Sequence, residues 1–69
     1  MIIGGGHMRI DKVKFAAELT RQDMTQKRLA ELSGVSRVTI SAIKSGKSCS
    51  DAVGQKLAST LGVELTELM

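Results

Sequence analysis

Two helices joined by a tight turn are predicted by residues 26–46, QKRLAELSGVSRVTISAIKSG. Apolar residues recur at three- and four-residue spacing on both sides of Gly34, which is the pattern of helices with one buried face. Gly34 can take the left-handed conformation that ends a helix, and Ser36 is a favourable N-cap for the next one. Because only Val35 separates these two signals, the helices are expected to cross steeply.

Cap and stop signals extend the helical pattern to both sides of this pair. Helices are expected over residues 12–22, 26–33, 37–45 and 51–61, followed by a last turn near residues 65–68. Their predicted N-caps are, in chain order, Asp11, Thr25, Ser36, Ser50 and Thr66. The apolar face of the first helix is expected to comprise Val13, Ala16 and Ala17, widened by Phe15 and Leu19. No sustained strand alternation follows Met8, so the chain is predicted to be all-α, a compact bundle of about five short helices.

The length of 69 residues suffices for one small domain and excludes a two-domain enzyme. Residues 9–69 are expected to form that domain, and residues 1–8, with three consecutive glycines, a flexible tail or a cloning remnant. Cys49 is the only cysteine and His7 the only histidine, so the chain can form neither an internal disulfide nor a tetrahedral zinc cage. We therefore expect no metal and no cofactor.

Positive charge is concentrated in the middle of a chain whose net charge is +3. Residues 27–47 contain five basic residues and one acidic residue, whereas residues 48–69 contain one basic and three acidic residues. A basic stretch of this kind favours a polyanionic partner. Cysteine usage, together with the lack of a secretion signal and of an apolar run long enough to cross a membrane, predicts a cytoplasmic protein without a membrane partner.

The outward face of the third predicted helix differs from that of an ordinary surface helix. Its positions carry one cation, small hydroxyls and small apolar groups, namely Arg37, Val38, Ser41, Ala42 and Ser45. The side chains expected to lock the helix pair from the inside are Leu29, Val35, Ile40 and Ile43. A face that served only solubility would carry Glu and Lys, whereas small side chains with one Arg suit a helix that enters the DNA major groove, about 12 Å wide.

In these features the sequence resembles the Xre-like family of helix-turn-helix regulators, of the phage repressor and Cro type. The resemblance spans Ile10 to Met69, and the residues that carry it are Met24-Thr25-Gln26, Leu29-Ala30, Gly34-Val35-Ser36-Arg37, Thr39-Ile40-Ser41, Gly46-Lys47, Leu57-Ala58 and Leu61-Gly62-Val63. It implies a lambda-repressor-like DNA-binding domain. Helix 37–45 is then the recognition helix and reads base edges in the major groove.

The resemblance assigns two groups of residues to DNA contacts. Base contacts are implied for Ser36, Arg37, Val38, Ser41 and Ala42. Phosphate contacts are implied for Thr25, Gln26, Thr39, Ser45 and Lys47. Within these groups, Arg37 has the planar fork that pairs with guanine, and Val38 suits a thymine methyl group.

Simpler roles are open for several residues. Arg37 could bind a phosphate or pair with Glu31, and Val38 could contact the protein core. The cations that could be merely solvated are Lys27, Arg28 and Lys44. In addition, Lys44-Ser45 stands where many relatives carry Glu-Asn, so a contact made by those two family residues is not transferred to this chain.

The predicted function is sequence-specific binding of double-stranded DNA by a transcriptional regulator, a repressor that acts as a homodimer on a roughly palindromic site. The main alternative is an antitoxin-like or other partner-binding helix-turn-helix protein that acts through protein contacts, and a second is a promoter-recognition module resembling part of a sigma factor. An enzyme is not expected, because no base and nucleophile pair, metal set or phosphate loop is evident, and no small-molecule ligand is indicated. Leu65, Leu68 and Met69 are expected either at the dimer contact or in the monomer core.

Overall fold

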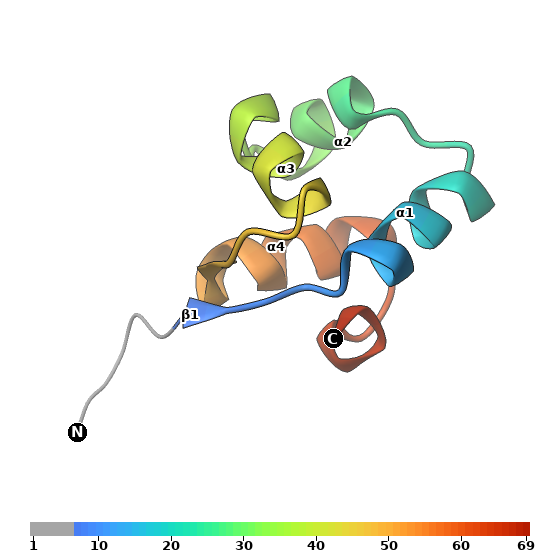
Figure 1. Cartoon of the computed structure of the whole chain (residues 1–69). Coiled ribbons are helices and arrows are strands. Elements are labelled where there is room, and N and C mark those ends of the chain that lie inside the picture. Colours follow the sequence, from blue (N-terminus) through green and yellow to red (C-terminus); the bar gives the residue numbers. More distant parts are fainter. Residues whose placement is uncertain (1–6) are drawn as a thin grey trace.

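A computed structural model describes residues 7–69 as a small helical domain (Figure 1). Its four α-helices are α1 (Lys12–Arg21), α2 (Gln26–Ser33), α3 (Arg37–Lys44) and α4 (Asp51–Leu61), and a 3-10 helix, η1, covers Leu65–Leu68. Two strands of two residues each, β1 (His7–Met8) and β2 (Cys49–Ser50), complete the secondary structure of this range. The predicted helical bundle is confirmed, and the strand pair is an addition that the sequence pattern did not indicate.

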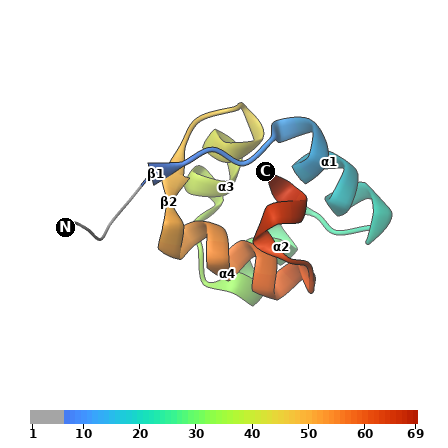
Figure 2. The ribbon, with the colours of Figure 1, turned by 90° about the horizontal axis from the view of Figure 1, so that it is seen from below.

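The helices surround one core. α2 and α3 lie together on one side of the molecule, α4 runs beneath them, and α1 and η1 close the remaining side (Figures 1 and 2). The largest side chains with no appreciable exposure come from every helix and from the segment before α1: Ile10, Phe15, Leu29, Ile40, Ile43, Leu57 and Leu68. Burial of such apolar side chains contributes roughly 1.5–3 kcal/mol each, so packing is the main source of stability.

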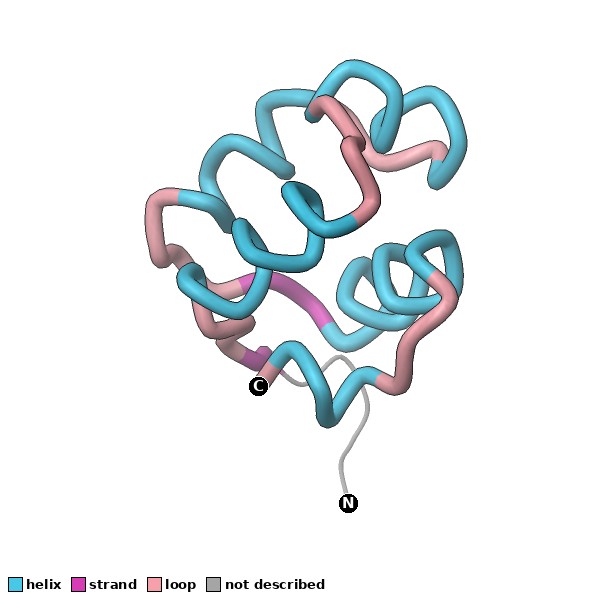
Figure 3. The backbone as a smooth tube through the Cα atoms, turned by 90° about the vertical axis from the view of Figure 1, so that its right-hand side faces the viewer, coloured by secondary structure: helices cyan, strands magenta, loops and turns pink. Residues whose placement is uncertain are grey.

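The helix ends are fixed by the capping residues that the sequence predicts. Hydroxyl oxygens of Thr25, Ser36 and Ser50 accept the backbone N–H three residues further on, at 3.0, 3.2 and 3.2 Å. At the start of α1, Asp11 Oδ1 accepts the backbone N–H groups of Val13 at 2.9 Å and of Lys14 at 3.0 Å. Each cap satisfies donors that a helix leaves free at its first turn. The short loops between the helices are visible in Figure 3.

The predicted apolar face of α1 is partly wrong. Val13 is 70% exposed and Ala17 is also exposed, whereas Phe15 and Leu19 are buried. Val13 lies two residues from Phe15, which is about 200° around a helix with 3.6 residues per turn. Since α1 packs against α3 and η1 through the side of Phe15 and Leu19, Val13 points away from the core.

The last helical turn lies where it is predicted, but its N-cap lies two residues earlier. Glu64, and not Thr66, is the N-cap of η1, and the Glu64 N–H donates to Glu67 Oε2 at 2.9 Å. A long carboxylate can therefore fold back to cap this turn, and Thr66 becomes an exposed residue inside it. Leu68 at the end of η1 is 1% exposed, and its carbonyl accepts the N–H of Asp11 at 2.7 Å, which ties the C-terminus to the start of α1.

The predicted tail over residues 1–8 does not extend to its last two residues. His7 and Met8 pair antiparallel with Ser50 and Cys49, respectively. Met8 also packs over Gly54 of α4, where an added Cβ would lie 2.5 Å from the Met8 sulfur. Pairing over two residues leaves no alternating pattern in a sequence, which explains why it was missed. Residues 1–6 of the predicted tail lie outside the described residues.

Candidate nucleic-acid interface

The turn between α2 and α3 holds the two helices at one fixed angle. Gly34 is left-handed, with φ 76°, and its N–H donates to the Ala30 carbonyl at 2.9 Å. The next residue, Val35, is only 6% exposed and belongs to the core, and its N–H donates to Ser33 Oγ at 3.1 Å. Because a buried side chain and two hydrogen bonds fix these residues, α3 starts in a defined direction after Ser36.

The outward side of α3 is solvent-exposed, as its sequence spacing predicts. Ile40 and Ile43 are buried, whereas Arg37, Val38 and Ser41 are exposed. Val38 is the most exposed large apolar side chain among the described residues, at 80%. Val38 therefore does not contact the core, and this exposed apolar group lies directly beside a cation.

A shallow hollow of about 570 Å³ lies on this face. It is lined by Gln26 of α2, by residues of α3 and by the loop that follows, and the complete set is Gln26, Arg37, Val38, Ser41, Ala42, Ser45 and Lys47. All seven residues belong to the ten for which the family resemblance implies DNA contacts. The fold thus brings together side chains that lie up to 21 positions apart in the sequence.

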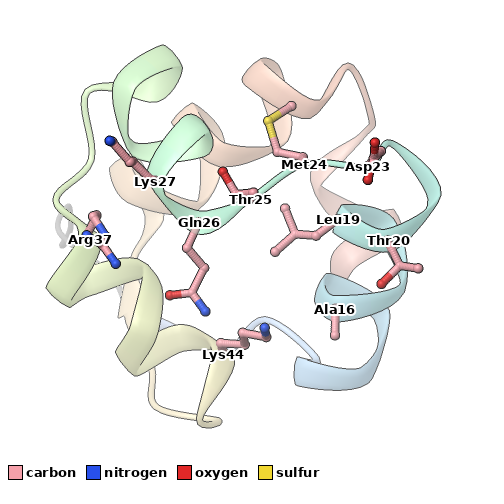
Figure 4. Close-up of a pocket in the computed structure, with 10 residues that line it drawn as sticks. All are labelled: Ala16, Leu19, Thr20, Asp23, Met24, Thr25, Gln26, Lys27, Arg37 and Lys44. Carbon is pink, nitrogen blue, oxygen red and sulfur yellow. The ribbon is translucent and has the colours of Figure 1, made fainter.

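A second groove, of about 550 Å³, opens between α1, the start of α2 and α3 (Figure 4). Thr25 and Gln26 line it together with the cations Lys27, Arg37 and Lys44, which outnumber the one acidic lining residue, Asp23. Figure 4 shows that the Gln26 amide and the Lys44 side chain extend into the opening from two different helices. The positive end of the α2 dipole and these cations favour an anion at this position.

The three cations that could be merely solvated, Lys27, Arg28 and Lys44, have different surroundings in the structure. Arg28 forms an ion pair with Glu31, with 3.5 Å between Nη1 and Oε1. Lys27 and Lys44 line the groove of Figure 4, and neither they nor Arg37 has an ion-pair partner within residues 7–69. No ion pair joins Arg37 and Glu31, and the Glu31 carboxylate pairs with Arg28 instead.

The hydroxyl groups of this region differ in what they can still donate. Ser36 Oγ donates to Thr39 Oγ1 at 3.0 Å, and Ser45 Oγ donates to the Ser41 carbonyl at 3.1 Å. A phosphate only accepts hydrogen bonds, so Ser36 and Ser45 must first release these partners. Thr25 Oγ1 and Thr39 Oγ1 act as acceptors in the structure, which leaves both hydroxyl hydrogens available. Ser36 and Thr39 do not line the hollow on α3, although both lie at its N-terminal end.

Other chemistry has less support in the described residues. Between residues 7 and 69, no group of three or more His, Cys, Asp or Glu side chains is placed to hold a metal ion. Burial raises the pKa of the Cys49 thiol, and the charge of Asp51 adds to this effect, so the thiolate is disfavoured. No helix in this range is long and apolar enough to cross a membrane.

A tight turn between two short helices, the second presented outward, defines a helix-turn-helix domain. The helix-turn-helix family model (HTH_3) matches residues 15–68, and the chain belongs to this family. The match confirms the resemblance to Xre-like proteins and identifies a DNA-binding type of domain. A comparison with curated proteins gave no match.

Solved structures with the same fold belong to much longer chains. The chain is similar to a mutant of hydroxyethylphosphonate dioxygenase, with a TM-score of 0.79 and 27% identity over 90% of this chain and 14% of that one. It is also similar to native PhpD with cadmium atoms, with a TM-score of 0.77 and 27% identity over 90% of this chain and 13% of that one. This chain therefore corresponds to a small helical part of those proteins.

Proposed function

We propose that the chain binds double-stranded DNA in a sequence-specific manner and acts as a transcriptional repressor, with α3 in the major groove. The observation that carries this proposal is the hollow on α3, since all of its lining residues are of types suited to DNA and none is acidic. Family membership supports the same conclusion. An interface of this kind attracts phosphates over its whole surface and selects bases through a few side chains.

Base reading is assigned chiefly to Arg37 and Val38. Arg37 lies in the first turn of α3, where helix-turn-helix proteins place their base contacts, and its guanidinium is free of an acidic partner within residues 7–69. A bidentate contact to guanine contributes about 1–3 kcal/mol of discrimination. The exposed Val38 side chain is assigned to a thymine methyl group, and Ser41 and Ala42 are small enough to let the helix approach the base pairs closely.

Phosphate binding is assigned to both sides of α3. On one side, the start of α2 offers free N–H groups, the Thr25 hydroxyl and the Gln26 amide, with Lys44 extending toward them across the groove of Figure 4. On the other side, Lys47 in the loop after α3 supplies a cation. Lys44 thus replaces the acidic family residue with a group that adds to DNA attraction.

We further propose that the protein acts as a homodimer, because one recognition helix buries only about 600–1,000 Å² and gains affinity from a second half-site. Of the three residues considered for the dimer contact, Leu68 is 1% exposed and belongs to the monomer core. Met69 is 53% exposed and Leu65 is half-buried, so they stay candidates for the contact. Sedimentation of the free protein and of its DNA complex tests this: a monomer in both states overturns it.

A second candidate is a module that acts through protein contacts. The structural matches favour it, because the matched region is only 13–14% of the longer chains, a dioxygenase and PhpD, and so lies within a larger protein. Catalysis by this chain itself is not proposed, since one His, one Cys and no Tyr leave few groups for it.

Selection of bound duplexes from a random pool tests the main proposal. We expect an enriched, roughly palindromic sequence whose binding weakens steeply as salt is raised, because phosphate contacts release counterions. Selection without any enriched sequence, or binding that is insensitive to salt, would favour the protein-binding candidate.

A further inference from the structure

A cation at the start of α1 and another in the segment before it lie next to the C-terminal end of α3. A third hollow, of about 370 Å³, is lined there by Arg9, Lys12 and Val13 on one side and by Ser45 and Gly46 on the other. Ser45 also lines the hollow on α3, so the two hollows adjoin. A Cβ atom placed on Gly46 would lie 3.5 Å from Lys12 Cδ, which shows that the Lys12 stem packs along the turn after α3.

These cations are available for an external partner. Arg9 and Lys12 are exposed, and neither takes part in an ion pair within residues 7–69. Asp11 also lines this hollow as the cap of α1, where it accepts the N–H groups of Val13 and Lys14, and the two cations outnumber its single negative charge. Lys14 has a different role, because its Nζ donates to the Met69 carbonyl at 2.7 Å and so joins the fold itself.

The C-terminal end of α3 needs such cations if it lies against DNA. The carbonyl groups at the end of a helix carry partial negative charge, which repels phosphates. Lys44 and Lys47 offset this charge from within α3 and its loop, and Lys12 adds a cation from a helix far away in the sequence. Residues 1–26 carry a net charge of only +1, so the charge distribution along the sequence gave no sign of this contribution.

We infer that Arg9 and Lys12 bind backbone phosphates next to the base pairs that α3 reads, and so extend the DNA contact beyond the major groove. The inference rests on the proposed function and adds a flank to it. These contacts carry no base preference of their own, because phosphates are the same at every position. Val13, which also lines this hollow and is exposed, is apolar and does not contribute to phosphate binding.

The test compares salt dependence between variants on a selected duplex with long flanks. The double variant Arg9→Gln/Lys12→Gln is expected to lower the slope of log affinity against log salt by about two units, since each phosphate contact accounts for about 0.9. Its base preference is expected to match that of the unchanged protein. Lys56→Gln serves as the control, because Lys56 is an exposed cation of α4 that lines none of the three hollows. It is expected to change the slope by less than about half a unit.

A shortened duplex gives the second readout. When the duplex ends at the base pairs read by α3, the double variant and the unchanged protein are expected to bind equally, because the flanking phosphates are gone. An unchanged slope on the long duplex overturns the inference, and so does an equal loss on both duplexes. If the unchanged protein itself shows no salt-dependent duplex binding, the proposed function fails and the inference falls with it. Circular dichroism melting of each variant verifies that the fold is intact.

Discussion

Arg28 and Glu31 form an ion pair across one turn of α2, with 3.5 Å between Nη1 and Oε1. Both side chains are exposed, so the pair itself adds little stability. The pair matters for the charge of this region, because it balances the one acidic residue between positions 27 and 47. Arg37 has no ion-pair partner within residues 7–69, so its proposed base contact requires no internal ion pair to break.

Replacement of Arg37 separates base reading from charge. Arg37→Ala is expected to weaken binding to the selected duplex by about 5- to 150-fold, equivalent to 1–3 kcal/mol, and to relax the preference at one base pair. Arg37→Lys keeps the charge without the fork, and we expect it to restore affinity for scrambled DNA but not the base preference. Binding to the selected and scrambled duplexes by fluorescence anisotropy measures both effects. Equal losses on the two duplexes for Arg37→Ala would contradict the assignment.

Lys44 and Arg28 are cations of equal charge in different settings. Lys44→Gln is expected to lower the salt slope by about one unit, because Lys44 faces the groove at the start of α2. Arg28→Gln is the matched control, and its effect is expected to be smaller because Glu31 already balances Arg28. Salt titrations of DNA binding by both variants measure the two slopes. A slope loss as large for Arg28→Gln as for Lys44→Gln would show that the groove of Figure 4 has no special role.

Met8 and Gly54 are expected to be coupled energetically. In a Met8→Ala background, Gly54→Ala should raise the free energy of unfolding by at most about 0.8–1 kcal/mol, because Ala favours a helix interior over Gly but the new Cβ still lies 3.3 Å from Leu65 Cδ1, which must shift slightly. In the unchanged protein the same substitution forces Met8 away, since the new Cβ lies 2.5 Å from the sulfur, and the gain should be smaller by at least about 0.5 kcal/mol. Urea denaturation of the four proteins gives the coupling energy. Additive effects would place Met8 away from α4.

Asp23 stores a small backbone strain. It is the one non-glycine residue with positive φ among residues 7–69, at 53°, and it follows Gln22, the C-cap of α1, with its N–H donating to the Thr20 carbonyl. Asp23→Gly is expected to stabilise the protein by about 0.5–1 kcal/mol, because glycine adopts this conformation without the steric cost of a Cβ atom. Asp23→Ala removes the same charge but keeps the Cβ. If it stabilises the protein as much as Asp23→Gly in thermal melts, the gain is electrostatic and the strain argument is wrong.

The cap of α1 predicts a pH dependence. Hydrogen bonding from the Lys14 N–H, with a smaller contribution from the Val13 N–H, lowers the pKa of Asp11 below its ordinary value of 3.8. A lowered carboxyl pKa stabilises the fold above the unfolded value, and the contribution is lost as pH falls through the folded value. Asp11→Asn keeps the cap oxygen without the charge. The difference in melting temperature between the two proteins, clear at about pH 7, should therefore shrink at about pH 2. A difference that is independent of pH would exclude this role for the charge.

Local signals in the sequence predicted the parts of the fold that depend on local interactions. The N-caps at Thr25, Ser36 and Ser50 were correct because each bonds to a backbone N–H only three residues away. The outward face of α3 was also correct, since Ile40 and Ile43 determine which side is buried.

Features that depend on distant partners were missed. The buried side of α1 is chosen by α3 and η1, so the exposure of Val13 cannot be inferred from α1 alone. In the same way, the pairing of Met8 with Cys49 and the position of Lys12 beside Gly46 join residues more than 30 positions apart. Long-range contacts of this kind leave no periodic signal in a single sequence.

The separation of inward and outward side chains on α3 makes the recognition surface exchangeable. Arg37, Val38 and Ser41 are exposed and contribute nothing to the core, whereas the angle of α3 is set by Gly34 and Val35 in the preceding turn. A library randomised at the three exposed positions should therefore yield mostly folded proteins with new sequence preferences. Evolution could retarget this domain by the same route, without redesign of the scaffold.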